Sequence, residues 1–316
     1  MIKGKASMLT EESADHVETG PRVSVVVPAR NEARNLPHVL GALPPGLHEV
    51  ILVDGHSVDD TIAVARKVLP SIRIVQQTRK GKGNALACGF AAVTGDVIVM
   101  LDADGSADPA EIPAFVAALV AGADFAKGTR FAQGGISHDI TRFRRLGNAM
   151  LNLMVNVLYK TRYSDLCYGY NVFWSRVLPV LDLPPVQLPG LGATDMVWGD
   201  GFEIETLINV RVAAAGARIT EVGSCEKERL FGESNLNAVT DGLRVLRTIM
   251  AERGRQAERT RRGMAVQPAT PVPPATLIEP VDPNRPTRLT VIDLRDKADL
   301  DAQLDSIGPV HGARGA

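Results

Sequence analysis

Two aspartates, one residue apart, follow the most apolar strand-like run of this 316-residue chain. The run is residues 97–101, and Asp102, Ala103, Asp104 and Gly105 come directly after it. Paired carboxylates at the end of a buried strand repel each other and lose hydration unless a positive charge lies between them. Carboxylate oxygens suit Mg²⁺ or Mn²⁺, so the spacing favours a divalent-metal site on Asp102 and Asp104. The same residues are also ordinary turn formers, so the choice depends on the rest of the chain.

Two other apolar runs, residues 23–27 and 50–53, also end in residues that can face a polar ligand. The residues that follow them are Pro28, Ala29, Arg30, Glu32 and Asp54. Apolar residues at helical spacing separate the runs, which predicts alternating strands and helices and a parallel sheet covered on both faces. Ligands of such sheets bind at the carboxyl ends of the strands. We therefore expect these residues to meet Asp102 and Asp104 in one crevice.

The second half of the chain continues this alternation less regularly. Asp108, Pro109 and Glu111 form a capping-box pattern that opens a helix. Beyond it we expect a strand at 123–131, a loop at 132–145, an apolar helix at 146–159, a short sheet segment at 164–183, a long loop at 184–198, a helix from 200, a strand at 218–222 and a last helix at 239–250. The helix at 146–159 is apolar enough to pack in the core, which we favour, or to face lipid.

Composition divides the chain into one folded domain and unpatterned ends. The predicted divisions are a disordered tail at 1–20, a domain at 21–254, a Pro-rich linker at 255–288 and a C-terminal tail at 289–316, with a nucleotide-binding half at 21–106 and an acceptor half at 107–254 in the domain. The ends lack periodic apolar residues, so we expect them to carry no chemistry.

Bulk properties exclude several classes of protein. The formal net charge is −1, which gives no electrostatic footprint for nucleic acid. The three cysteines lie far apart, which argues against a zinc site or a disulfide framework and suits a reducing cytoplasm. No apolar run approaches the length of a bilayer span, and the first residues lack the apolar core of a signal peptide. We expect a cytoplasmic protein, with peripheral contact at the inner face of the membrane left open.

Neither common phosphate-binding loop is present. The chain has no G-x-x-x-x-G-K-[ST] motif, and no G-x-G-x-x-G follows the first predicted strand. The sequence therefore argues against a P-loop NTPase and against a dinucleotide-binding dehydrogenase.

Three blocks of the first half resemble the family 2 glycosyltransferases of the GT-A fold. They are VSVVVPARNEARNL, ILVDGHSVDDT and GKGNALACGFAAVTGDVIVMLDADGS. Later blocks look like the dolichol- or polyprenol-phosphate sugar synthases of that family: GTR at 128–130, RRLGN at 144–148, DLCYGYNVF at 165–173, GFEIE at 201–205 and RLFGES at 229–234. The resemblance covers roughly residues 22–252. It implies an α/β fold with a doubly wound, mostly parallel sheet and helices on both faces, followed by a flexible C-terminal extension.

The resemblance also implies a donor, a cofactor and site residues. The donor would be a UDP- or GDP-linked sugar, with Mg²⁺ or Mn²⁺ held by Asp102 and Asp104. The residues expected to border the donor are Pro28, Ala29, Arg30, Glu32, Asp54, Lys82, Asp102, Ala103 and Asp104. Arg79 and Lys80 are further candidates to reach the diphosphate or the base, as Lys82 is. The chain departs from the family at Gly55, where a second Asp is frequent, and at Ser106, where the synthases often carry Gln.

The acceptor decides which further residues matter. A lipid phosphate already carries an anionic oxygen, so arginines would bind it and no strong base is needed. The positions that match this role are Arg130, Arg144, Arg145, Arg229 and Ser234. A hydroxyl acceptor instead needs a carboxylate to take its proton. Asp200 and Glu203 are the candidates for that catalytic role beside Asp104, although both also suit the first turn of a helix.

The expected function is a metal-dependent, inverting transfer of a hexose, glucose or mannose, to a polyprenyl-phosphate acceptor. One alternative keeps the donor but uses a soluble glycan or small-molecule hydroxyl. Another is a non-catalytic nucleotide-sugar-binding protein, against which the intact pair Asp102 and Asp104 argues. Sugar nucleotidyl transfer would need a Gly-rich loop with Arg after the first strand, and residues 28–32 do not form one.

Overall fold

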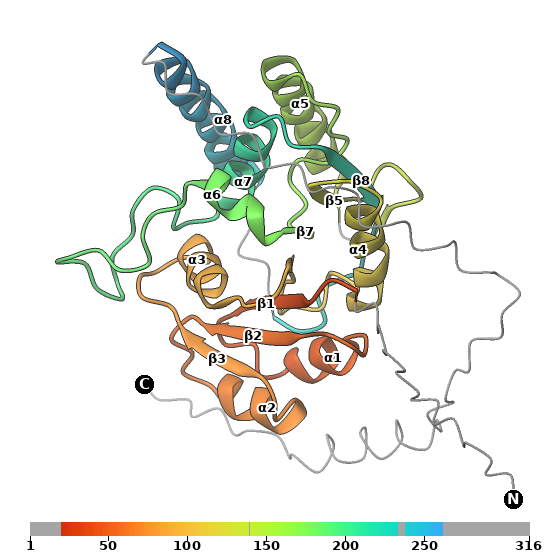
Figure 1. The fold of residues 1–316 in the computed structure, drawn as a ribbon, viewed down its shortest axis with the longest axis vertical. Helices are drawn as coiled ribbons and strands as arrows, with labels where there is room; N and C mark the ends of the chain where they lie inside the picture. The colour runs from red at the N-terminus through yellow and green to blue at the C-terminus, as the bar shows by residue number, and fades with distance from the viewer. Residues whose placement is uncertain (1–19, 139, 233–237, 262–316) are drawn as a thin grey trace, which may run out of the picture. The chain divides into compact units, whose positions relative to one another are not determined.

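The computed structural model describes residues 20–138, 140–232 and 238–261. Among them a seven-stranded sheet has the order β3-β2-β1-β4-β7-β5-β8 (Figure 1). The strands in chain order are β1 (Val23–Ala29), β2 (Glu49–Asp54), β3 (Arg73–Gln76), β4 (Val97–Met100), β5 (Phe125–Thr129), β7 (Asn171–Trp174) and β8 (Ile219–Gly223). The first four run parallel, β7 is antiparallel to its neighbours, and β8 is parallel to β5.

Alternation along the buried strands gives the sheet two apolar faces. Val25 and Val27 face one side, where α1 (Leu36–Gly41), α2 (Thr61–Val68) and α4 (Ile112–Val120) pack. Val26 faces the other, against the helices α3 (Lys82–Ala92), α6 (Leu178–Leu181) and α7 (Ile204–Ala214). Helices therefore cover both faces, as Figure 1 shows, and the predicted α/β, doubly wound, mostly parallel fold is confirmed.

A third, smaller apolar cluster lies beyond the sheet. It is formed by α5 (Arg142–Tyr159), α7 and α8 (Ala238–Arg261), with Val155, Tyr159, Val210 and Ile249 at its centre. The short elements that complete the description are η1 (Pro109–Glu111), η2 (Ser175–Val177), β6 (Ile136–Ser137) and β9 (Cys225–Glu226). None of the helices in the described ranges is both long and apolar enough to cross a bilayer.

Several predicted details are wrong. The capping box does not form: Asp108 accepts a hydrogen bond from the Ala110 N–H, but Glu111 instead accepts bonds from Ser224 Oγ and Cys225 N. The helix expected from 146 begins at Arg142, because Thr141 caps it by accepting the Arg144 N–H.

At the end of the domain, α8 continues to Arg261, past the predicted start of the linker at 255. The predicted N-terminal tail up to residue 19 lies outside the described residues, as do the rest of the linker and the C-terminal tail from residue 262.

Candidate active site

The carboxyl ends of β1, β2 and β4 lie next to one another. Ala29 pairs with Asp54 at the ends of β1 and β2, and β4 pairs with β1 on its other side. Asp54 is buried and accepts hydrogen bonds from the Ser57 N–H at 3.2 Å and from Gln76 Nε2 at 2.9 Å. Arg30 remains exposed beside it. The sequence therefore placed the three strand ends correctly, as the fold of the sheet requires.

Lys82 forms ion pairs with an acid that follows β4 and with an acid of α7. Gly81 and Gly83 flank it, and a Cβ atom on either would lie about 2 Å from a backbone oxygen of residues 199–200 (2.1 Å and 1.9 Å). Glycine therefore lets α3 begin directly against that loop, with Lys82 as its first residue. The Lys82 Nζ atom lies 2.7 Å from Asp102 Oδ1 and 2.5 Å from Glu205 Oε1.

Arg229 likewise forms ion pairs with two acids, Asp104 and Glu32. Its guanidinium lies 2.9 Å from Asp104 Oδ2 and 3.6 Å from Glu32 Oε1. The other Asp104 oxygen accepts the N–H and Oγ–H of Ser106, at 3.0 and 2.7 Å. The segment that carries Arg229 is also held by its backbone, because the Leu230 N–H reaches the Asp104 carbonyl oxygen at 3.3 Å.

The electrostatics of this group leave negative charge unbalanced. Burial raises the pKa of Asp102; Lys82 opposes that shift and Asp104 adds to it. Burial likewise raises the pKa of Glu32, with Asn35 and Arg229 acting against it. The four carboxylates Glu32, Asp102, Asp104 and Glu205 contact only two cations in the ion pairs of the described residues, Lys82 and Arg229. Two negative charges remain, the charge that a divalent cation would neutralise.

The donor set fits a metal that is shared with a ligand. Within the described ranges no three His, Cys, Asp or Glu side chains already converge as a metal site. Mg²⁺ commonly binds one or two carboxylates and completes its shell with water and substrate phosphates. Asp102 and Asp104 can supply those two carboxylates, and the remaining ligands would come from a diphosphate.

The contacts of Asp200 and Glu203 oppose their predicted role as bases. Asp200 is buried in a two-pronged ion pair with Arg79, at 2.7 and 2.9 Å, so neither side chain is free to reach a ligand. Glu203 accepts the backbone N–H groups of Gly199 and Gly201. Both acids hold the loop before α7 in this structure, and their predicted role as bases, like that of Arg79 at the diphosphate, stays a prediction.

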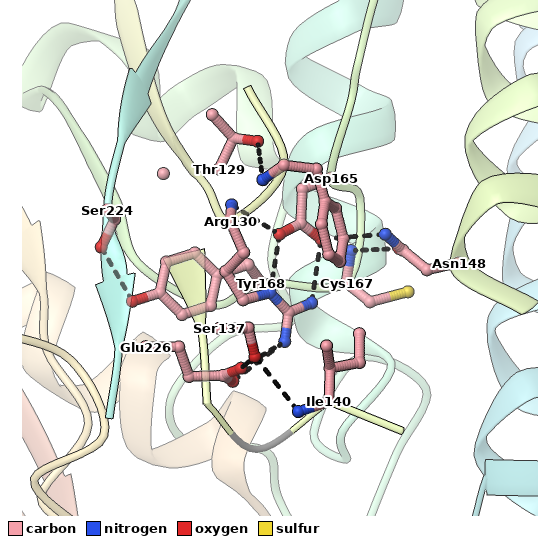
Figure 2. Close-up of polar contacts among 12 residues, drawn as sticks. Thr129, Arg130, Ser137, Ile140, Asn148, Asp165, Cys167, Tyr168, Ser224 and Glu226 are labelled. Atoms are coloured by element: carbon pink, nitrogen blue, oxygen red, sulfur yellow. Dashed lines mark hydrogen bonds and ion pairs between the residues drawn. The ribbon is translucent and has the colours of Figure 1, made fainter. Parts of the chain in front are cut away.

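Arg130 also lies in a structural cluster rather than at an open anion site (Figure 2). Its guanidinium donates to both oxygens of Asp165, at 2.7 and 2.9 Å, and to both oxygens of Glu226, at 2.9 and 3.0 Å. Asn148 of α5 donates to Asp165 as well, at 3.1 Å. The donors of Arg130 are thus already used inside the protein, and its predicted contact with the acceptor phosphate stays a prediction.

The other predicted acceptor residues lie in different places. Arg144 and Arg145 are in the first turn of α5, where the Arg145 guanidinium lies 5.2 Å from the centre of the Phe131 ring. Arg229 is on Asp104, and Ser234 lies outside the described residues. The structure thus separates the predicted arginines into a buried one, two on a helix and one that contacts Asp104.

Sequence reasoning missed Glu205. It lies in the first turn of α7, and its carboxylate meets both Lys82 and the backbone at Gly169, where an added Cβ would be 2.6 Å from Glu205 Oε1. The motif GFEIE at 201–205 contains Glu205, but the sequence favours Asp200 and Glu203 as the candidate bases. Helical spacing shows that buried Ile204 and Ile208 mark the core face of α7. It gives no distance from Glu205 to Lys82, so the sequence alone carries no signal for that contact.

Comparison with known proteins agrees with this geometry. The family model described as glycosyl transferase family 2 matches residues 24–178. An uncharacterized glycosyltransferase of Mycobacterium tuberculosis is 32% identical over 229 residues, which cover 71% of this chain and 93% of that protein. The undecaprenyl-phosphate mannosyltransferase of Micrococcus luteus is 31% identical over 228 residues, covering 68% and 88%.

A solved structure shows the same fold. Glucosyl-3-phosphoglycerate synthase from Mycobacterium tuberculosis, in complex with Mn²⁺, UDP and phosphoglyceric acid, aligns with a TM-score of 0.57 at 21% identity, over 74% of this chain and 79% of that one. That likeness supports the predicted GT-A fold class, and the relatives confirm the predicted family and enzyme class. From its sheet, its strand-end acids and its relatives, the chain belongs to glycosyltransferase family 2.

Proposed function

We propose that this glycosyltransferase moves a hexose from a UDP- or GDP-sugar to a polyprenyl phosphate, with inversion and with Mg²⁺ or Mn²⁺ at Asp102 and Asp104. The observation that carries the proposal is the group of four carboxylates and two cations at the ends of the parallel strands. Such a group suits a ligand that brings both a divalent cation and phosphates, which is what a nucleotide-diphosphate sugar does.

On the donor side, each residue has a role that its position allows. Asp54 and Arg30, at the ends of β2 and β1, face the nucleoside together with Pro28 and Ala29. Lys82 and Arg229 move from the carboxylates to the oxygens of the diphosphate. Glu205 and Glu32 keep these two cations oriented while Asp102 and Asp104 hold the metal. The bound metal would act as a Lewis acid on the departing diphosphate.

On the acceptor side, the contacts favour a nucleophile that is already an anion. The acids predicted as bases, Asp200 and Glu203, are committed to Arg79 and to backbone N–H groups. A phosphate oxygen of the acceptor can form the new bond to the anomeric carbon without losing a proton. The bond from that carbon to the diphosphate breaks on the opposite face, and its electron pair leaves with the nucleoside diphosphate. Arg144 and Arg145 are the remaining candidates to bind the acceptor phosphate.

The names of the relatives support a lipid-linked acceptor. Besides the Micrococcus luteus protein, polyprenol monophosphomannose synthase of Mycolicibacterium smegmatis is 29% identical over 218 residues, 64% of this chain and 82% of that protein. A soluble hydroxyl acceptor remains the alternative, and it would require Glu205 to act as the base.

A donor panel tests the proposal. UDP- and GDP-linked glucose and mannose are incubated with the protein and Mn²⁺, with and without a short-chain polyprenyl phosphate, and the nucleoside diphosphate released is measured. We expect release to rise strongly with the lipid phosphate for one donor. Equal release with a soluble sugar alcohol would shift the assignment to the alternative acceptor. Tight donor binding without turnover in any mixture would contradict catalysis altogether.

A further inference from the structure

Helix α5 is apolar on two opposite faces. One face packs in the core through Val155 and Tyr159. The other carries a row of large apolar side chains at intervals of four, three and four residues, and each is exposed: Leu146 by 63%, Met150 by 65%, Leu153 by 66% and Val157 by 70%. At 100° per residue these four side chains fall within one narrow stripe opposite the core face. We call them the α5 stripe.

Polar contacts on the core face fix the direction in which the stripe points. Asn148 donates to Asp165, Asn152 donates to the Ser164 carbonyl oxygen at 2.5 Å, and Asn156 donates to the Tyr163 carbonyl oxygen at 2.8 Å. These asparagines lie four residues apart, so they pin the helix along three of its turns. The stripe cannot roll into the core without breaking these bonds. A row of exposed large apolar residues held in this way indicates a surface that meets something apolar.

The charge around the stripe selects its partner. Residues 142–162 include Arg142, Arg144, Arg145, Lys160 and Arg162, and no Asp or Glu. A second copy of this chain placed on the stripe would bring two such sets of cations together. An anionic lipid surface instead complements both features, since its acyl region accepts apolar side chains and its headgroups accept Arg and Lys.

We propose that α5 binds an anionic membrane surface, with the α5 stripe in the interface and its flanking cations at the headgroups. The arrangement matters for catalysis because the first turn of α5 carries Arg144 and Arg145, and this link rests on the lipid-phosphate acceptor proposed above. The membrane binding itself does not require that acceptor. Docking along α5 would place these two arginines at the level where a lipid-linked phosphate lies.

Vesicle flotation of the full chain tests the surface without donor or acceptor. Vesicles of phosphatidylcholine alone are compared with the same lipid mixed with phosphatidylglycerol. We expect binding to the anionic vesicles, and a loss of at least about tenfold in the double variant Met150→Glu with Leu153→Glu. The matched control is Leu191→Glu, which adds a charge at an exposed leucine in the loop after α6 and should bind as the parent does.

A second pair of substitutions separates charge from apolar contact. Arg142→Ser with Lys160→Ser should lower binding to the anionic vesicles by roughly tenfold, and leave the weak binding to neutral vesicles unchanged. Both double variants should keep the parent melting temperature, because these side chains are exposed, and should keep donor hydrolysis measured without acceptor.

The outcomes separate this proposal from the proposed function. Parent protein that fails to float with anionic vesicles, or a stripe variant that floats as the parent does, would overturn the membrane surface. If the stripe variant instead turns a dimer into a monomer while vesicle binding is unaffected, a second copy covers the stripe and the proposal is wrong. Intact vesicle binding with no sugar transfer to any lipid phosphate would leave the docking surface standing and remove the proposed function.

Discussion

Two ion-pair clusters in this protein use the same residue types in opposite ways. At the strand ends, Lys82 and Arg229 each touch two acids, and their side chains remain 15% and 30% exposed. In the cluster of Figure 2, Arg130 is 9% exposed and its partner Asp165 is fully buried. The first pair of cations has donors left for a ligand. The second cluster has satisfied its donors and acceptors internally.

Burial and geometry, more than residue type, distinguish an arginine that keeps donors available for a ligand from one whose donors are all used inside the protein. A buried two-pronged pair is costly to break, because either partner left alone is an uncompensated buried charge. A partly exposed pair exchanges partners at lower cost, since water can replace the lost contact. At the strand ends the acids also outnumber the cations, so a cation-bearing ligand improves the electrostatics of the site.

The largest expected effect is loss of turnover at the exposed cluster. Asp104→Asn should lower turnover by about a thousandfold or more, because in the proposed reaction the metal held by Asp104 would supply several kcal/mol of leaving-group stabilisation. Steady-state release of the nucleoside diphosphate measures it, and thermal melting should show an unchanged fold. More than a tenth of the parent turnover would remove Asp104 from the site.

Substitution in the buried cluster of Arg130, Asp165 and Glu226 should lower the free energy of unfolding. Arg130→Met leaves Asp165 and Glu226 without their cation, and we expect the free energy of unfolding to fall by about 3–5 kcal/mol. Arg229→Met is the matched control at the exposed cluster, where the loss should stay below about 1 kcal/mol. Urea unfolding of both variants gives the comparison. Equal losses would mean that the two clusters do not differ as we describe.

Asp200→Asn distinguishes a structural acid from a catalytic base. Weakening its ion pair with Arg79 should cost about 2 kcal/mol of unfolding free energy. The dependence of turnover on pH should keep its shape at temperatures where the variant is folded. An acidic limb that disappears in the variant would instead restore Asp200 as the base.

A smaller effect concerns donor affinity. Lys82→Met should weaken binding of UDP or GDP in the presence of Mn²⁺ by roughly tenfold, since one charge-assisted hydrogen bond to the diphosphate is lost. Calorimetric titration measures it. Lys80→Met is the control, because Lys80 is exposed and should change the affinity little. Parent-like affinity in the Lys82 variant would separate Lys82 from the donor.

The smallest expected effect concerns the pH dependence of stability, to which Glu32 and Asp124 contribute with opposite signs. Burial raises the pKa of Glu32 in the folded protein above the unfolded value of 4.5. Below pH 4.5 the carboxyl is protonated in both states and does not lower the stability. As pH rises through the folded pKa, the folded protein must hold a buried charge, and stability is lost. Burial acts the same way on Asp124, but hydrogen bonds from Arg218 and Arg176 lower its pKa overall. Its stabilisation is present above the unfolded value of 3.8 and is lost as pH falls through the folded pKa.

Substitutions of Glu32 and Asp124 test whether the two acids contribute to stability with opposite signs. Glu32→Gln should raise the free energy of unfolding at pH 7 by roughly 0.5 kcal/mol, and the gain should vanish near pH 4. Asp124→Asn should lower it at pH 7. Urea unfolding across pH checks both, and a destabilised Glu32→Gln variant at pH 7 would contradict the unbalanced charge at the strand ends.

The strand ends could be predicted because their signal is local. The run before Asp102 is apolar at every position, and the residue type changes abruptly where β4 ends at Met100. The same holds for Asp54 after the buried residues of β2. Neighbouring parallel strands end at one edge of a sheet whatever loops join them, so adjacency of these acids follows from the fold class alone.

The role of each charged residue in the acceptor half could not be read in the same way. Arg130 was expected to bind phosphate, but its partners Asp165 and Glu226 come from positions 35 and 96 residues along the chain. Glu205 and Asp200 lie in one short stretch, yet one meets Lys82 and the other meets Arg79.

The sequence by itself determined the alternation of strands and helices in the first half and the acids that follow the strands, because apolar periodicity and turn residues act within a few positions of one another. Only the tertiary structure decided which cations are consumed inside the protein and which remain for a ligand. A charged side chain is satisfied by whichever opposite charge packing brings within about 3 Å, and that choice depends on segments far apart in the chain.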